Sequence, residues 1–231
     1  MGLTLDKIVP WGRLFEEYVS MFSLSEIDLK GQILGCGDGP AGFNATLTQR
    51  GGSVTSLDPL YAFNPTQIRD RIADTYDTVL TQMCTNQDSY VWDVIPSTKE
   101  LGRIRMSAME IFLIDFESGQ KHGRYVAGSL PHLPFKEKSF DLGLASHFLF
   151  LYSEHLSVEF HVDSLLDMLR VAREVRIFPI LSLDGKVSPH LRPVTEQLAK
   201  QGFNAELRRV AYEFQRGGNE MLVITPRKSA P

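Results

Sequence analysis

This sequence has few cysteines, little excess of charge of either sign and no long apolar run. Its 231 residues include only 2 cysteines, Cys36 and Cys84, and these lack CxxC spacing. A disulfide-stapled mini-protein is therefore excluded, and both thiols fit a reducing compartment. Apolar runs such as residues 148–152 fall far short of the roughly 18 to 20 residues that a membrane-spanning helix needs. We expect no membrane span.

The formal net charge is only −4. A nucleic-acid-binding domain usually carries a basic stripe or patch, so no nucleic-acid partner is expected. The first seven residues contain no basic region followed by an apolar core, which predicts no secretory signal and a cytoplasmic location. A small-molecule substrate is the expected partner, and the sequence leaves the oligomeric state open.

Strand-like and helical segments alternate along most of the chain. Strands are expected at residues 32–34, 54–57, 125–130, 140–146, 175–181, 205–212 and 221–225, with helices at 11–23, from Pro40 onward, at 158–174 and at 188–202. This alternation predicts an α/β fold, a Rossmann-like three-layer sandwich with a seven-stranded, mostly parallel sheet. About eight residues join the last two strands, too few for a parallel crossover, so the terminal strand is expected to run antiparallel.

Two long helical patterns interrupt this alternation after the second strand. Ile68 and Ile72 recur on one helical face, and Ser97 with Glu100 forms a capping-box signature before a second helix. No linker divides the chain. We therefore expect a single domain over residues 1–231 with a helical insertion at residues 62–123 that covers the substrate.

The most informative segment is a glycine-rich turn after the first strand, made of Gly35, Cys36, Gly37, Asp38 and Gly39. A strand that stops on Gly-x-Gly-x-Gly lets the backbone approach a ligand closely and presents amide groups to it, as a nucleotide-sized cofactor requires. Asp58, at the end of the second strand, is placed to accept hydrogen bonds from a ribose. Residues 37–42 also match GxGxxG, so this motif alone leaves an NAD-dependent oxidoreductase open.

Further features distinguish between these cofactors. Ile-Leu-Gly-Cys-Gly-Asp-Gly at residues 33–39 resembles the first motif of class I S-adenosylmethionine-dependent methyltransferases. Leu-Pro-Phe at 133–135, followed by Ser-Phe-Asp-Leu at 139–142, resembles that family's link into its fourth strand, and the antiparallel terminal hairpin is its topology. The resemblance covers residues 31–61 and 124–225, and it implies S-adenosylmethionine as the cofactor. The whole chain is also similar to a group of uncharacterised methyltransferase-like proteins, which indicates no substrate.

The resemblance implies roles for individual residues. The turn from Gly35 to Gly39 would lie under the methionine and ribose moieties, and Asp58 would hold the ribose hydroxyls. Pro59 or Leu60 would pack on adenine. Ser129 and Leu130 stand where the family usually has an acidic residue and its neighbour at the adenine edge.

Two positions depart from the family pattern. Ile33 stands where many members carry an acidic residue before the first glycine, and Ser129 replaces the acid at the adenine edge. Each replacement removes an anchor for the cofactor. A non-catalytic, methyltransferase-like binding module is therefore the alternative to an active enzyme.

Residues after the fourth strand are expected to face the transferred methyl group, because ligands of open α/β sheets bind beyond the carboxyl ends of the strands. Ser146 and His147 lie there. An ordinary histidine pKa suits a general base, and the alternative is a histidine that hydrogen-bonds the backbone. A possible metal cluster matches no recognised ligand spacing, so no metal is expected; its members would be His147, Glu154, His155, Glu159 and His161.

Overall fold

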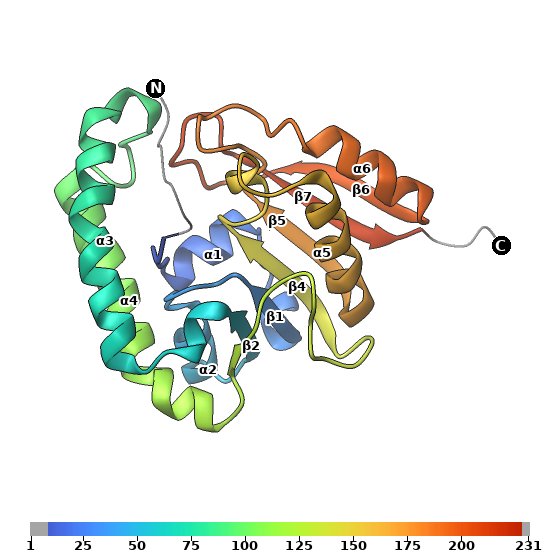
Figure 1. Cartoon of the computed structure of the whole chain (residues 1–231), viewed down its shortest axis with the longest axis horizontal. Helices are drawn as coiled ribbons and strands as arrows, with labels where there is room; N and C mark the ends of the chain where they lie inside the picture. The colour runs from blue at the N-terminus through green and yellow to red at the C-terminus, as the bar shows by residue number, and fades with distance from the viewer. Residues whose placement is uncertain (1–8, 228–231) are drawn as a thin grey trace.

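The computed structural model describes residues 9–227, which form one seven-stranded sheet (Figure 1). The strands are β1 (Gln32–Cys36), β2 (Ser53–Asp58), β3 (Tyr125–Ala127), β4 (Phe140–Ser146), β5 (Ala172–Phe178), β6 (Phe203–Arg209) and β7 (Glu220–Pro226), in the order β3-β2-β1-β4-β5-β7-β6. The first five strands pair in parallel, whereas β7 runs antiparallel to both β5 and β6. The structure thus confirms the Rossmann-like sandwich and its antiparallel terminal hairpin.

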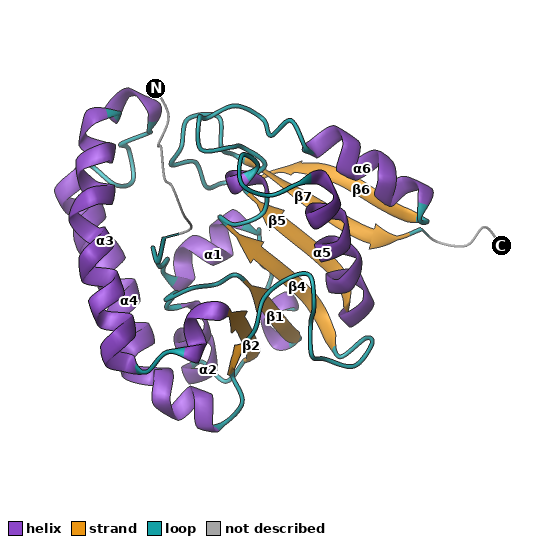
Figure 2. Ribbon diagram, viewed as in Figure 1, coloured by secondary structure: helices purple, strands orange, loops and turns teal. Residues whose placement is uncertain are grey.

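Helices cover both faces of this sheet (Figure 2). The helices are α1 (Phe15–Met21), α2 (Phe43–Gln49), α3 (Pro65–Thr85), α4 (Thr98–Lys121), α5 (Val158–Val171) and α6 (Leu191–Lys200), with short 3₁₀ segments η1 (Asp28–Lys30), η2 (Pro59–Ala62), η3 (Gln87–Ser89) and η4 (Phe150–Tyr152). α1 and α2 pack on one face, and α5 and α6 on the other. α3 and α4 pack against each other beyond the β2–β3 side of the sheet (Figure 1).

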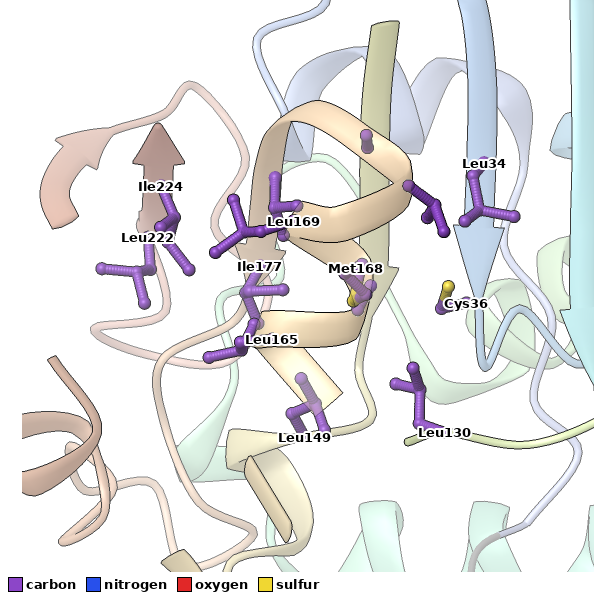
Figure 3. Packing of buried hydrophobic residues seen from close by; sticks show 14 of the residues in the cluster. Leu34, Cys36, Leu130, Leu149, Leu165, Met168, Leu169, Ile177, Leu222 and Ile224 are labelled. Atoms are coloured by element: carbon purple, nitrogen blue, oxygen red, sulfur yellow. The ribbon is translucent and has the colours of Figure 1, made fainter. Parts of the chain in front are cut away.

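Alternating side chains along the central strands build two separate cores. Ile33 of β1 and Leu144 of β4 point toward α1 and α2. Leu34 and Cys36 point into the opposite core, against α5 (Figure 3). This two-residue period buries both faces of β1, as a central parallel strand requires. The carboxyl ends of β1, β2 and β4 are thereby held next to one another.

The turn after β1 is longer than the sequence predicts. Pro40 is expected in the first turn of a helix, but residues 37–42 form an irregular turn and α2 begins at Phe43. The Gly39 N–H donates to the Asp58 carboxylate at the end of β2, at 2.9 Å. This bond holds the turn against the neighbouring strand and delays the start of the helix.

The boundary between α5 and β5 also differs from the prediction. The helix expected at residues 158–174 ends at Val171. Ala172 has extended backbone angles and pairs with Phe140 of β4. The apolar helical pattern therefore continues into a strand, because sheet pairing outweighs the local periodicity.

Residues 62–123, the predicted insertion, contain α3 and α4. Phe112 and Phe116 of α4 pack with Tyr61 of η2 and Tyr125 of β3 in a group of rings that we call the aromatic cluster. The Phe116 ring centroid lies 5.0 Å from that of Phe112 and 5.5 Å from that of Tyr125. Such ring separations are typical of stabilising aromatic pairs.

Among the described residues, no helix is both long enough and apolar enough to cross a membrane. Residues 1–7, on which the prediction about a secretory signal rests, lie outside the described part of the chain.

Candidate functional site

A cavity of about 500 Å³ lies at the carboxyl ends of β1, β2 and β4. Ten of the predicted site residues line it: Gly37, Asp38, Gly39, Asp58, Pro59, Leu60, Ser129, Leu130, Ser146 and His147. The other two do not belong to its lining, since Cys36 is fully buried against α5 and Gly35 lies beneath the Asp38 carboxylate. The volume falls in the range of small-molecule sites.

The glycine-rich turn presents its backbone to the cavity. Gly37 and Gly39 have φ values of +68° and +53°, a region that favours glycine. A Cβ placed on Gly37 would contact the Phe148 ring at 3.0 Å, whereas the space around Gly39 is open to at least 4 Å. A ligand can therefore approach the backbone closely at Gly39.

Asp58 organises the junction between this turn and β2. Its Oδ2 accepts the Gly39 N–H at 2.9 Å, and its Oδ1 accepts the Leu60 N–H at 2.8 Å. Burial raises the pKa of the carboxyl, and the two backbone hydrogen bonds oppose that rise. Each carboxylate oxygen has a second lone pair, so Asp58 can accept two further hydroxyl groups from the cavity side.

Asp38 is a second buried carboxylate at the turn. Its Oδ1 accepts the Tyr18 hydroxyl at 2.9 Å, and its Oδ2 accepts the Ser56 hydroxyl at 2.6 Å. Burial raises the pKa of Asp38 to about 6, against the effect of both hydrogen bonds. A Cβ on Gly35 would collide with this carboxylate. Asp38 therefore supplies a carboxylate at the end of β1. It does so although Ile33, where many members of the resembled family carry an acidic residue, is apolar.

His147 occupies a strained position directly after β4. Its φ is +52°, which is uncommon for a residue with a side chain, and its N–H donates to the Phe178 carbonyl at 2.6 Å. Ring atom Nδ1 lies 2.9 Å from Ser146 Oγ. Burial, followed by the charges of Arg13 and Arg105, holds the pKa of His147 well below its ordinary value.

This shift corrects the prediction of an ordinary pKa at His147. Both arginines come from distant parts of the sequence, so local spacing gives no sign of them. The imidazole is therefore neutral at pH 7. It can accept or donate a hydrogen bond there without carrying charge.

Arg13 also lines the cavity, although no motif in the sequence marks it as a site residue. Its Nη1 donates to the Trp11 carbonyl at 2.8 Å, and its Nε is buried without an acceptor. Within residues 9–227, no acidic side chain forms an ion pair with Arg13. The nearby Glu17 carboxylate is already engaged by Arg105, at 2.6 and 2.8 Å, and by the Tyr212 hydroxyl. Since a guanidinium stays protonated, this side of the cavity is positively charged.

One sequence feature marks this N-terminal segment. A Cβ on Gly12 would collide with the Pro40 carbonyl, and the Gly42 N–H donates to the Arg13 carbonyl at 3.0 Å. The glycine thus allows the segment to lie directly on the glycine-rich turn. The Trp-Gly-Arg run at 11–13 is the signal from which this contact could have been suspected.

The far side of the cavity is apolar and aromatic. The Tyr90 and Phe214 rings stack there with centroids 5.0 Å apart, and Met83 of α3 lies beside them. Arg216 donates to the carbonyls of Asp88 and Tyr90, both at 3.1 Å, and so fastens the β6–β7 connection to the insertion. The insertion therefore forms a wall of the cavity opposite the glycine-rich turn.

In the part of the chain that the structure describes, no three His, Cys, Asp or Glu side chains gather in a way that could hold a metal ion. The His161 Nδ1 lies 2.7 Å from the Ser157 carbonyl, and its Nε2 is buried without a hydrogen-bond partner among residues 9–227.

The chain is similar to an archaeal protein along nearly its whole length. The chain is 32% identical over 225 residues to the uncharacterised protein MJ0045 of Methanocaldococcus jannaschii, covering 96% of this chain and 98% of the relative. No family model matches the sequence.

Solved structures are similar at lower identity. Protein PH0226 of Pyrococcus horikoshii OT3 is 12% identical, with a TM-score of 0.47, covering 92% of this chain and 91% of its own. The 1,6-didemethyltoxoflavin-N1-methyltransferase of Burkholderia thailandensis, solved with 1,6-didemethyltoxoflavin and S-adenosylhomocysteine, is 15% identical with a TM-score of 0.46, covering 93% of this chain and 77% of its own.

Proposed function

The chain belongs to the family of the archaeal protein MJ0045, and from that premise and its site geometry we propose that it is an S-adenosylmethionine-dependent methyltransferase acting on a small molecule. The observation that carries the proposal is the Asp58 carboxylate. It faces the cavity from the end of β2 while it fixes the open Gly39 turn through a 2.9 Å hydrogen bond. A ribose beside an exposed backbone turn is the ligand that this pairing fits.

The cavity lining fits the rest of the cofactor. Leu60 and Leu130 supply apolar surfaces on the β2–β3 side, where adenine would lie. Arg13 and Asp38 supply opposite charges near the glycine-rich turn, which suit the carboxylate and ammonium of a methionine moiety. The residues present therefore match a nucleoside joined to an amino acid.

The acceptor would enter from the insertion side. S-adenosylmethionine supplies an electrophilic methyl group on a sulfonium, and most of the catalysis can come from aligning the nucleophile with that group. Tyr90, Phe214 and Met83 form an apolar wall there, which fits a small molecule with an apolar body. The expectation that residues 62–123 cover the substrate is part of this proposal.

Isothermal titration calorimetry of the purified chain with S-adenosylmethionine and S-adenosylhomocysteine tests the proposal. We expect both to bind, and Asp58→Ala to weaken S-adenosylhomocysteine at least about 100-fold, roughly 3 kcal/mol, because the ribose contacts and the turn are lost together. Asp163→Ala on the exposed side of α5 is the matched control and is expected to bind as the wild type does.

Absence of binding by the folded wild type at millimolar concentration of either compound would overturn the proposal. Equal binding by Asp58→Ala and wild type would place the ligand elsewhere. Tight binding without methyl transfer to any component of a cell extract would instead support a non-catalytic binding module.

A further inference from the structure

The insertion contains four arginines, and one of them has no carboxylate partner. The other three form ion pairs with glutamates: Arg69 with Glu110, Arg103 with Glu100 and Arg105 with Glu17. Within residues 9–227, the guanidinium of Arg71 makes neither a hydrogen bond nor an ion pair. Its charge is therefore left unbalanced by the described side chains around it.

Arg71 packs on an aromatic ring at the cavity instead. Its Cζ lies 3.8 Å from the centroid of the Phe63 ring, which is a cation–π distance. Both residues line the cavity, Phe63 from the turn between η2 and α3 and Arg71 from the second turn of α3. The N–H donors of a guanidinium lie in its own plane, so stacking leaves them free to bind another group. The ring thus holds the guanidinium at the cavity without using its donors.

A count of the charges around the cavity gives Arg71 a separate place. Four charged side chains line it: Arg13, Asp38, Asp58 and Arg71. The proposed cofactor engages three of them, since Asp58 suits its ribose and the Arg13 and Asp38 charges suit its methionine moiety. Arg71 is left over, and the sulfonium of the cofactor adds a further positive charge. Because bound groups match the charge of their surroundings, the remaining ligand is expected to be negatively charged.

Arg71 shares its helix with part of the apolar wall. Val79 and Met83 of α3 are buried and line the same cavity. An α-helix rises about 1.5 Å per residue, so Val79 lies about 12 Å further along the helix axis than Arg71. α3 therefore presents a charged end and an apolar end to the cavity. A ligand with an anionic group at one end of an apolar body fits this arrangement.

We propose that Arg71 binds a carboxylate group of the methyl acceptor, and that the acceptor is a small apolar molecule with one negative charge. The proposal rests on the proposed function, since it assigns the substrate class of that same cavity. A guanidinium can bind a carboxylate through two parallel N–H···O bonds. Its single positive charge balances a carboxylate more fully than a phosphate group, whose charge at pH 7 is about −1.5 to −2.

A matched pair of ligands tests the charge. 5-Phenylpentanoate has a ring at one end and a carboxylate at the other, and 5-phenylpentanamide has the same body without the charge. Both are titrated into the chain, with S-adenosylhomocysteine present and absent, and binding is measured by protein-detected NMR. The acid is expected to bind about fivefold more tightly than the amide. The factor is modest because Arg71 is exposed, so that solvent screens its charge.

Two arginine variants assign this preference to one side chain. Arg71→Met removes the charge and keeps an unbranched side chain next to Phe63. It is expected to abolish the preference for the acid, while the affinities for the amide and for S-adenosylhomocysteine stay within about twofold of wild type. Arg69→Met, two residues away, is the matched control. It breaks the exposed pair with Glu110 and is expected to keep the preference.

Equal affinities of the acid and the amide in the wild type would overturn the proposal, and so would a preference that survives in Arg71→Met. Failure of the acid to bind at millimolar concentration would also contradict it. A loss of S-adenosylhomocysteine affinity in Arg71→Met would assign this arginine to the cofactor, against the proposal.

The proposed function fails in a different way. If S-adenosylhomocysteine does not bind and the Arg71-dependent preference persists, the carboxylate site stands and the methyltransferase assignment is refuted. If S-adenosylhomocysteine binds and the preference is absent, the assigned substrate class is refuted and the proposed function stands.

Discussion

The end of the sheet at the glycine-rich turn and the helical insertion differ in the kind of side chain that each buries. At this end of the sheet, buried ionisable groups accumulate: Asp38 and Asp58 both have raised pKa values, and the pKa of His147 is lowered. In the insertion, the buried groups are mainly rings and aliphatic side chains, and the buried Arg105 of α4 is paired with Glu17. Buried charge costs free energy unless a partner or ligand compensates it, whereas buried apolar surface stabilises. Burial therefore costs free energy at the cavity end of the sheet, whereas in the insertion, which also forms one wall of the cavity, it mainly stabilises the fold.

The largest effect is expected at the aromatic cluster. Phe116 is fully buried and contacts three other rings, so Phe116→Ala should lower the free energy of unfolding by about 3–5 kcal/mol. Urea denaturation measures this, with the exposed Ile114→Ala as the control. A loss below about 1 kcal/mol would show that the cluster is not the stabilising element described here.

Glu17→Gln, which breaks the buried ion pair between α1 and α4, is expected to lower the free energy of unfolding by a similar amount. Arg105 is 1% exposed and would keep a buried charge without its carboxylate, which typically costs about 3–5 kcal/mol. Burial acts to raise the Glu17 pKa, but the charge and hydrogen bonds of Arg105 outweigh it and lower the pKa overall. The stabilisation is therefore present above the unfolded pKa of about 4.3 and is lost as pH falls through the lower folded value.

Denaturation of Glu17→Gln and wild type between pH 3 and 8 measures this dependence. Glu16→Gln, at the exposed ion pair with Arg50, is the control and should stay within about 0.5 kcal/mol of wild type. A Glu17→Gln variant as stable as wild type at pH 7 would mean that the buried pair contributes nothing.

The pH dependence of the stability of Asp38→Asn tests the buried carboxylate at the glycine-rich turn. Because the folded pKa of Asp38 is raised to about 6, protonated Asp38 is the form that the fold favours, and wild-type stability falls as pH rises through that value. The stability of Asp38→Asn relative to wild type should therefore increase by up to about 3 kcal/mol between pH 4 and pH 7.5. A difference that does not change with pH would refute the raised pKa.

Tyr61 joins the two regions, and its substitution should have the smallest effect. It belongs to the aromatic cluster, and its hydroxyl donates to the Gly39 carbonyl at 2.7 Å. Tyr61→Phe keeps the ring and removes this bond, so we expect a loss of about 1 kcal/mol in stability and a weakening of S-adenosylhomocysteine binding of less than about tenfold. A greater than tenfold change in affinity would show that the insertion controls the turn more strongly than this single bond implies.

Much of the fold follows from the sequence because connection lengths decide it. The short link between β6 and β7 forces an antiparallel pair, and the glycine-rich turn marks the end of β1. Helix boundaries are less predictable, since the start of α2 depends on the bond from Gly39 to Asp58 across the sheet.

The chemistry of the site is less readable than the fold. The glycines and Asp58 follow a spacing rule, and the structure places Gly37, Gly39 and Asp58 at the cavity. The partners of Asp38 and His147 obey no such rule, because Tyr18 and Arg13 reach them from the N-terminal segment. These contacts exist only after the chain has folded.

A crystal structure of the chain with S-adenosylhomocysteine tests the central claim most directly. The account predicts the nucleoside in the cavity beside Gly39, with the ribose hydroxyls within hydrogen-bond distance of Asp58 and the adenine between Leu60 and Leu130. Binding outside this cavity, or a ribose turned away from Asp58, would contradict it.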